Sequence, residues 1–125
     1  MRRIDLNYIL DIHRSAIDAG IRDEAKLRDA VRDMGTLEYI VDKANRIRDE
    51  IKRAAFLLYS IANYHPFVEG NKRTALLLAE VTLKECYIDA NGQEVNQMVR
   101  KIAAGELDEM QTIKWIEERY KRAFH

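Results

Sequence analysis

A single proline interrupts the most apolar part of this sequence, and it constrains the fold more than any other feature. Pro66 is the only proline in 125 residues, and only five glycines accompany it as strong helix breakers. Elsewhere, apolar residues recur at intervals of three and four, the spacing of one helix face. Proline stops a helix because it lacks an amide hydrogen and its ring clashes with the preceding turn. The sequence therefore predicts an all-α protein with a break at Pro66.

This spacing predicts six or seven helices. They cover residues 5–19, 27–34, 37–47, 49–65, 71–85, 95–102 and 110–120. Asp5 is the expected N-cap of the first helix, and three glycines are the expected stops of others: Gly20, Gly35 and Gly105. Residues 89–92 predict a turn, and residues 86–88 are a weak candidate for a short strand.

One of these helices should lie at the centre of the molecule. Residues 75–79 are apolar on every side, so the helix that begins at Asn71 should be buried. The sequence contains no internal repeat and no linker-like segment. We therefore expect residues 1–125 to form one compact single-domain bundle around a buried central helix.

Composition excludes several classes of protein. With 47% hydrophobic and 34% charged residues, the chain is too apolar to be disordered and too charged to be a membrane protein. The 21 Lys and Arg residues balance 21 Asp and Glu residues, so we expect no direct nucleic-acid partner. No run near 18 consecutive apolar residues occurs, so we expect no membrane partner. A single cysteine, Cys86, forms no internal disulfide, and the sequence opens without an apolar leader. These features predict a cytoplasmic location.

The connection after the break carries the candidate site, with the sequence HPFVEGNKRT at residues 65–74. We expect Asn71 to cap the buried helix, whose first amides lack partners and carry the positive end of its dipole. Gly70 lets a ligand approach this backbone closely. Lys72 and Arg73 place two cations where the dipole disfavours them, and an anion would offset that cost. The stretch predicts an anion site with phosphate as its natural occupant.

Two further side chains add chemistry to this loop. A single carboxylate beside phosphates is a usual way to hold Mg²⁺, which identifies Glu69 as a candidate metal ligand. Histidine is the side chain whose ordinary pKa lies near neutrality, so His65 is a candidate general base. Phe67 should anchor the loop in the core. The combination favours transfer of a phosphate-containing group from a nucleotide to a hydroxyl.

This run resembles the Fic/Doc family pattern His-x-Phe-x-(Asp/Glu)-Gly-Asn-(Gly/Lys)-Arg. The resemblance extends to the flanking helices and the first helix, but not beyond about residue 88. Position by position, it implies a general base at His65 and a ligand at Glu69 for Mg²⁺ on the phosphates of ATP. Asn71 would position the loop or the phosphates, and the anion-binding turn would be lined by Gly70, Lys72 and Arg73.

Two departures separate this sequence from the AMP-transferring members of the family. Lys72 stands where those enzymes have a second glycine, and Leu76 stands where they have a second arginine. The lysine is similar to the Doc branch of toxins, which phosphorylate a threonine of elongation factor Tu. The resemblance thus implies an ATP-dependent protein kinase with a translation factor as its protein substrate. AMP transfer and a catalytically silent nucleotide-binding or antitoxin-binding module are the alternatives.

Many family members carry an inhibitory helix of the form (Ser/Thr)-x-x-x-Glu-(Gly/Asn). Within these 125 residues no Ser or Thr is followed by Glu at the fourth position. The resemblance therefore implies that a separate antitoxin chain restrains the toxin.

Simpler interpretations exist for three features near this loop. His13 lies on the apolar stripe of the first helix and is expected to be a satisfied core or boundary residue. Glu69 and Arg73 could form a plain surface ion pair. Acidic residues separate a group of cations that should form a solvated face: Lys43, Arg46, Arg48, Lys52 and Arg53. The alternative is that residues 35–49 border the site and dock the protein substrate.

Overall fold

The computed structural model describes residues 2–19, 31–84 and 86–122. Within these ranges it contains six helices and one small sheet. The helices are α1 (Leu6–Ala19), α2 (Met34–Arg46), α3 (Glu50–Tyr64), α4 (Asn71–Thr82), α5 (Gly92–Ala103) and α6 (Glu109–Glu117), and the strands are β1 (Cys86–Ile88) and β2 (Tyr120–Arg122). The predicted all-α architecture is confirmed. None of the described helices combines the length and the apolar character needed to cross a membrane.

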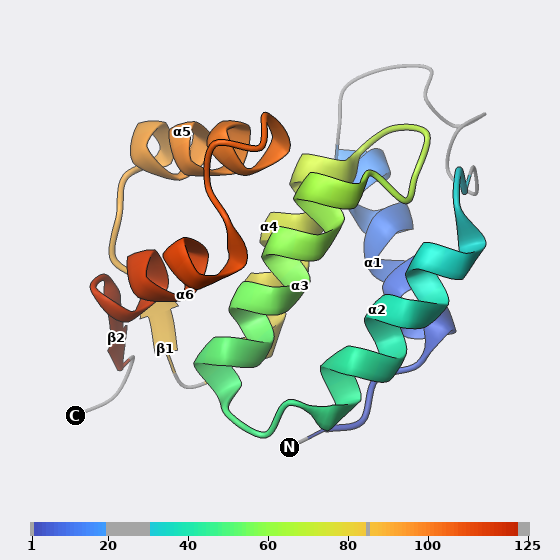
Figure 1. The fold of residues 1–125 in the computed structure, drawn as a ribbon, viewed down its shortest axis with the longest axis horizontal. Helices are drawn as coiled ribbons and strands as arrows, with labels where there is room; N and C mark the ends of the chain where they lie inside the picture. The colour runs from blue at the N-terminus through green and yellow to red at the C-terminus, as the bar shows by residue number, and fades with distance from the viewer. Residues whose placement is uncertain (1, 20–30, 85, 123–125) are drawn as a thin grey trace.

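Helix α3 lies at the centre of the molecule, with α4 packed along it (Figure 1). Helices α1 and α2 cover one side of this pair, and α5 and α6 cover the other. Residues 54–58 of α3 are buried on every side. The helix predicted to be central, α4, is less enclosed, because Leu76 and Leu77 are only half-buried. The centre of the bundle is therefore α3, and the loop from α3 to α4 leaves it at one end.

Short polar side chains begin most of the helices. Asp33, Asp49, Asn91 and Asp108 each accept a hydrogen bond from the amide three residues further on. The predicted cap of α1 is confirmed, since Asp5 Oδ1 accepts from the amide of Tyr8 at 2.8 Å. Helix α4 is the exception, because its N-cap is a glycine and no side chain caps it.

Some predicted boundaries at the start of the chain need correction. Gly35 lies inside the first turn of α2, so the prediction that it ends a helix is wrong. The side-chain cap at Asp33 starts α2 ahead of this glycine. Gly20 and residues 27–30 lie outside the described residues. The predicted helix over 27–34 is wrong for residues 31–33, which are not helical, because Val31 pairs with Phe67 and the next two amides bind the carbonyl of Pro66.

The C-terminal boundaries differ in a similar way. The predicted stop at Gly105 is confirmed, with a φ of 78°. The last helix ends at Glu117, and Tyr120, predicted to extend it, instead pairs with Ile88 in the antiparallel sheet. The weakly predicted strand at residues 86–88 is confirmed.

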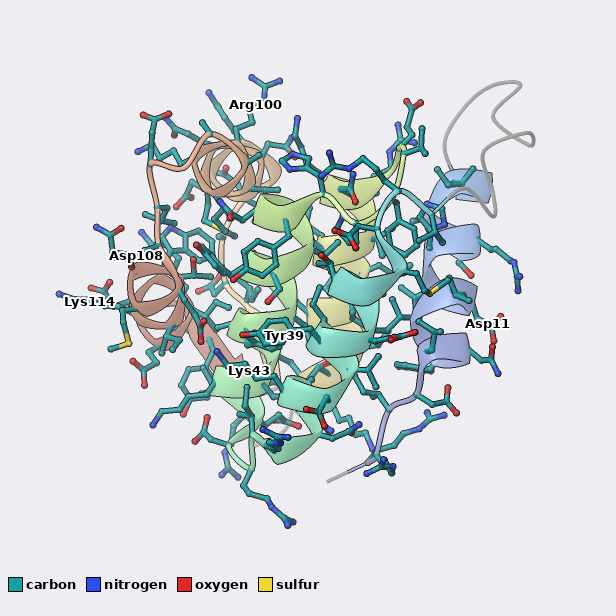
Figure 2. All side chains as sticks on the ribbon, turned by 45° about the vertical axis from the view of Figure 1, so that its right-hand side comes forward. Asp11, Tyr39, Lys43, Arg100, Asp108 and Lys114 are labelled. Atoms are coloured by element: carbon teal, nitrogen blue, oxygen red, sulfur yellow. The ribbon has the colours of Figure 1, made fainter. Side chains whose placement is uncertain are left out.

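The face that was predicted to be solvated is partly attached to the core. The prediction is wrong for Arg53 of α3, which is 4% exposed and whose Nε donates to a backbone carbonyl of α2 at 3.0 Å. Figure 2 shows Tyr39 and Lys43 on the side of α2 that faces α3. The Tyr39 ring meets the edge of Phe56 with centroids 6.5 Å apart, and Lys43 Nζ lies 4.8 Å from the centroid of the same ring. Lys43 Nζ also lies 3.8 Å from Glu109 Oε1 of α6. These contacts connect α2, α3 and α6.

Candidate functional site

His65 caps the C-terminal end of α3 in a left-handed conformation, with φ 52° and ψ 57°. Among the described residues it is the one non-glycine residue with a positive φ. Such conformations are costly and are concentrated at functional sites. Its Nδ1 lies 2.9 Å from the carbonyl oxygen of Asn63. Because a carbonyl only accepts, Nδ1 carries the hydrogen and donates, which leaves Nε2 as the basic nitrogen of the neutral ring.

The segment before α2, residues 31–33, acts as a strap across this end of the loop. The Arg32 side chain donates through Nε to the carbonyl of His65 at 2.7 Å and through Nη2 to the carbonyl of Tyr64 at 2.9 Å. A cation is favourable here, because the last carbonyls of a helix carry the negative end of its dipole. The guanidinium therefore fixes the backbone that carries His65.

The backbone of the strap binds the loop as well. The amides of Arg32 and Asp33 both donate to the carbonyl of Pro66, at 2.7 and 3.0 Å. Val31 forms an isolated antiparallel bridge with Phe67. Hydrogen bonds from the hydroxyl and the backbone amide of Thr36 hold the pKa of Asp33 below its usual value. The start of α2 and the loop are thus one connected unit.

Asn71 closes the loop from the other end. Its side chain is 8% exposed, and its Oδ1 accepts from the amide of Phe67 at 3.0 Å while its Nδ2 donates to the carbonyl of Phe67 at 2.9 Å. The prediction that Asn71 caps α4 is wrong: it is the first helical residue, and the N-cap is Gly70. The side chain turns back to Phe67 instead of reaching the amides of its own helix. Its bonds position the loop.

Helix α1 forms the floor of the loop. The buried ring of Phe67 stacks on His13, with centroids 3.7 Å apart and planes 4° from parallel. His13 Nε2 lies 2.9 Å from the carbonyl oxygen of Glu69. His13 is buried, as predicted for a core residue. Its bond to the loop was not predicted, because two residues 56 positions apart share no local pattern.

Gly70 is required at its position for two reasons. Its φ of 81° lies in the left-handed region, and a Cβ there would lie 2.6 Å from Ile17 Cδ1 of α1. The first backbone bond of α4 runs from the amide of Thr74 to the carbonyl of Gly70 at 2.9 Å. With no side-chain cap, the earlier amides of α4 lack helical acceptors, so they are available to an anion.

The charged side chains of the loop extend into solvent. Glu69, Lys72 and Arg73 are all exposed. In the parts of the chain that the structure describes, the ion pairs lie elsewhere, and none joins Glu69 to Arg73. The alternative of a plain Glu69–Arg73 ion pair is therefore not what the structure shows. Both cations can face a bound anion.

The loop fits a magnesium ion that arrives with a nucleotide. Among residues 2–19, 31–84 and 86–122, no group of three or more His, Cys, Asp or Glu side chains could hold a metal ion by itself. Glu69 provides a single exposed carboxylate. Mg²⁺ is commonly held by one or two carboxylates together with substrate phosphates and water. The donor set matches that case.

A cavity of about 540 Å³ opens beside α4, between β1 and α5. Its lining includes Leu76 and Glu80 of α4, Tyr87 of β1 and Asn96 of α5. Helical residues four apart share one face, and each residue adds 1.5 Å of rise, so Leu76 lies about 6 Å along the same face from Lys72. The cavity and Lys72 thus lie along one side of α4. Sequence reasoning missed it, because three separate elements form its walls.

Comparison with known proteins agrees with this geometry. A model of the Fic/DOC family matches residues 3–83, well over half of the chain, and this range includes α1–α4 and the loop. Among curated proteins, none matches the chain. The match over this range shows that the chain belongs to the Fic/DOC family, whose enzymes transfer nucleotide-derived groups to proteins.

Proposed function

We propose that this chain is a Doc-like protein kinase that transfers the γ-phosphate of ATP to a Ser or Thr hydroxyl of a protein. The loop carries this proposal. In this loop, Nδ1 of His65 donates to the carbonyl of Asn63, which leaves Nε2 to act as the base. At the start of α4, amides without helical acceptors lie beside the cations Lys72 and Arg73. The strap, Asn71 and α1 hold the loop in one shape, which is the preorganisation that phosphoryl transfer needs.

In this mechanism the substrate hydroxyl oxygen attacks the γ-phosphorus of ATP. Its proton passes to Nε2 of His65, and the bond from the γ-phosphorus to the β–γ bridging oxygen breaks, so ADP leaves. The Nδ1–H bond to the Asn63 carbonyl orients the ring and stabilises the imidazolium. The first amides of α4, with Lys72 and Arg73, stabilise the phosphate oxygens. Glu69 would hold Mg²⁺, which supplies further neutralisation of phosphate charge.

The cavity beside α4 favours a second candidate, transfer of AMP. The α4 residues that line this cavity, Leu76 and Glu80, lie about 6 and 12 Å along the helix from Lys72, so a nucleotide base there would extend its ribose and phosphates toward the start of α4. The α-phosphate would then reach the start of α4 first. Attack there would attach AMP to the hydroxyl and release pyrophosphate. Lys72 favours the kinase, because its side chain crowds the turn that would receive the α-phosphate.

The proposed partners follow from the family and from the sequence. The protein substrate would be a translation factor such as elongation factor Tu. A separate antitoxin chain would restrain the enzyme, since these 125 residues carry no inhibitory motif. The reaction would take place in the cytoplasm.

Label transfer distinguishes the two reactions. The chain is incubated with a bacterial-type translation factor, Mg²⁺ and ATP labelled at either the γ- or the α-phosphate. Label from γ-labelled ATP alone is the expected result, and label from α-labelled ATP alone replaces the kinase by AMP transfer. His65→Ala and Glu69→Ala should abolish transfer, whereas Glu117→Ala, an exposed carboxylate of α6, should not.

Calorimetry distinguishes both reactions from a silent binding module. The kinase requires nucleotide binding that strengthens with Mg²⁺ and weakens in Glu69→Ala. Nucleotide binding that is indifferent to both changes, together with no transfer by folded protein, would overturn the enzymatic proposal.

A further inference from the structure

The contact between His13 and the loop constrains one peptide group of the anion-binding turn. His13 Nε2 lies 2.9 Å from the carbonyl oxygen of Glu69. A carbonyl oxygen accepts only, so Nε2 carries the hydrogen and donates. The ring cannot easily rotate away, because it is buried and stacked on Phe67 at 3.7 Å. The Glu69 carbonyl is therefore held pointing toward α1.

This carbonyl belongs to the same rigid unit as the amide of Gly70. A trans peptide is planar, and its C=O and N–H point in opposite directions. With the Glu69 carbonyl fixed toward α1, the Gly70 N–H points away from α1. Within the described residues this amide has no hydrogen-bond partner. It is thus aimed at the open side of the turn, beside the free amides of α4.

Among the described residues, the bond from His13 is the one hydrogen bond that holds this peptide group. Rotation needs compensating changes in ψ of Glu69 and φ of Gly70, and glycine permits them in either direction. Ile17, one turn after His13, lies close to Gly70, since a Cβ built on this glycine would lie 2.6 Å from Ile17 Cδ1. The donor on His13 therefore favours the orientation in which the Glu69 carbonyl faces α1.

We infer that His13 is a positioning residue, which orients the Glu69–Gly70 peptide so that the Gly70 amide joins the phosphate-binding turn. This inference rests on the proposed function of the loop. His13 does not touch the substrate. It acts through the backbone, from a helix outside the sequence motif.

Two substitutions separate the hydrogen bond from the packing. His13→Phe keeps a flat ring for stacking on Phe67 and removes the donor. His13→Gln places an amide nitrogen near the position of Nε2, which keeps the donor and loses the stacking. The free energy of unfolding of each variant is measured with urea, so that effects on stability are known separately.

We expect nucleotide affinity and kcat to fall when the hydrogen-bond donor is removed, whatever the change in the free energy of unfolding. His13→Phe should lower the affinity for Mg²⁺–ADP and the kcat of transfer, each by on the order of tenfold. This is less than the loss expected when a donor that contacts the phosphate is itself removed, because the Gly70 amide is still present. His13→Gln should remain close to wild type in both, even where it is less stable. Equal losses in both variants, in proportion to their stability, would show a purely structural role and overturn the inference.

A second measurement keeps this test separate from the proposed function. In the ligand-free chain, the NMR signal and hydrogen exchange of the Gly70 amide report the orientation of its peptide. Both should change in His13→Phe and should remain as in the wild type in His13→Gln. An unchanged Gly70 amide in His13→Phe contradicts the inference. If the wild-type chain binds no nucleotide, the proposed function fails while this measurement still decides the role of His13.

Discussion

Gly70 is the residue on which the shape of the loop depends most. It combines a φ of 81° with a Cβ position 2.6 Å from Ile17 Cδ1. We predict that Gly70→Ala destabilises the chain by about 2–4 kcal/mol, from backbone strain and from the clash. Ile17→Val removes Cδ1, so Gly70→Ala should be less harmful in that background, and urea unfolding of the four proteins measures this coupling. Fully additive effects would show that the clash does not occur.

Asn71 allows a test of how firmly the loop is closed. Asn71→Ala leaves the buried amide and carbonyl of Phe67 without partners, so unfolding free energy should fall by about 2 kcal/mol or more. Asn7→Ala is the matched control, because Asn7 is exposed on α1, and it should change stability little. Urea denaturation measures both. A loss in Asn71→Ala no larger than in the control would contradict the role given to this side chain.

At this scale, the sequence identifies candidate residues in the loop but not the residues that support them. The pattern from His65 to Arg73 is local, so their types and spacing are visible in the sequence. The hydrogen bond of Arg32 to the loop joins residues 33 positions apart in the sequence, and that of His13 joins residues 56 apart. Such contacts form only when the helices pack. The role of Asn71 was misjudged for a related reason: its residue type suits a cap, but a buried partner at Phe67 competes with its own helix.

At the scale of elements, the strap connects the start of α2 to the end of α3. We predict that Arg32→Ala loosens this connection, because the carbonyls of Tyr64 and His65 lose their donors. The amides of residues 32 and 33, which bind Pro66, should then exchange hydrogen faster, and transfer should slow as His65 loses support. Arg32→Lys keeps the charge and one donor and should lie between wild type and Arg32→Ala. Unchanged hydrogen exchange of these amides in Arg32→Ala would show that the backbone hydrogen bonds hold the strap to the loop without the Arg32 side chain.

Elements with strong periodicity were predicted well, and short elements were not. Helix α3 and the stretch of α4 near the loop have clear apolar spacing and clear breakers around Pro66. Strand β2 has three exposed residues, and a strand so short shows no pattern of its own. It forms only because β1 lies beside it, with Tyr87 opposite Lys121.

At the scale of the molecule, the part beyond the family match belongs to the same core. Helices α5 and α6 pack on α3, and Ile102 and Ile116 are fully buried. We predict that Ile116→Ala costs about 2–5 kcal/mol, while Met110→Ala, which alters a residue 73% exposed, has little effect. Unfolding should remain one transition when followed by circular dichroism and by fluorescence of Trp115. Two separate transitions would contradict the prediction of a single domain.

The fold class was predictable because most of the chain has helical spacing and few breakers. The helix at the centre was not predictable, because the apolar run in α4 borders a cavity that the sequence does not reveal. Helix packing decides this, and single-sequence patterns carry no information on the order of neighbours.

The most direct test of the whole account is an NMR titration of the ¹⁵N-labelled chain with Mg²⁺ and a non-hydrolysable ATP analogue. We predict that the largest shifts fall on the amides of Gly70, Asn71, Lys72 and Arg73, and that Lys72→Ala combined with Arg73→Ala weakens binding. Saturable binding that shifts amides elsewhere and leaves these four unchanged would contradict the claim that the start of α4 receives the phosphates.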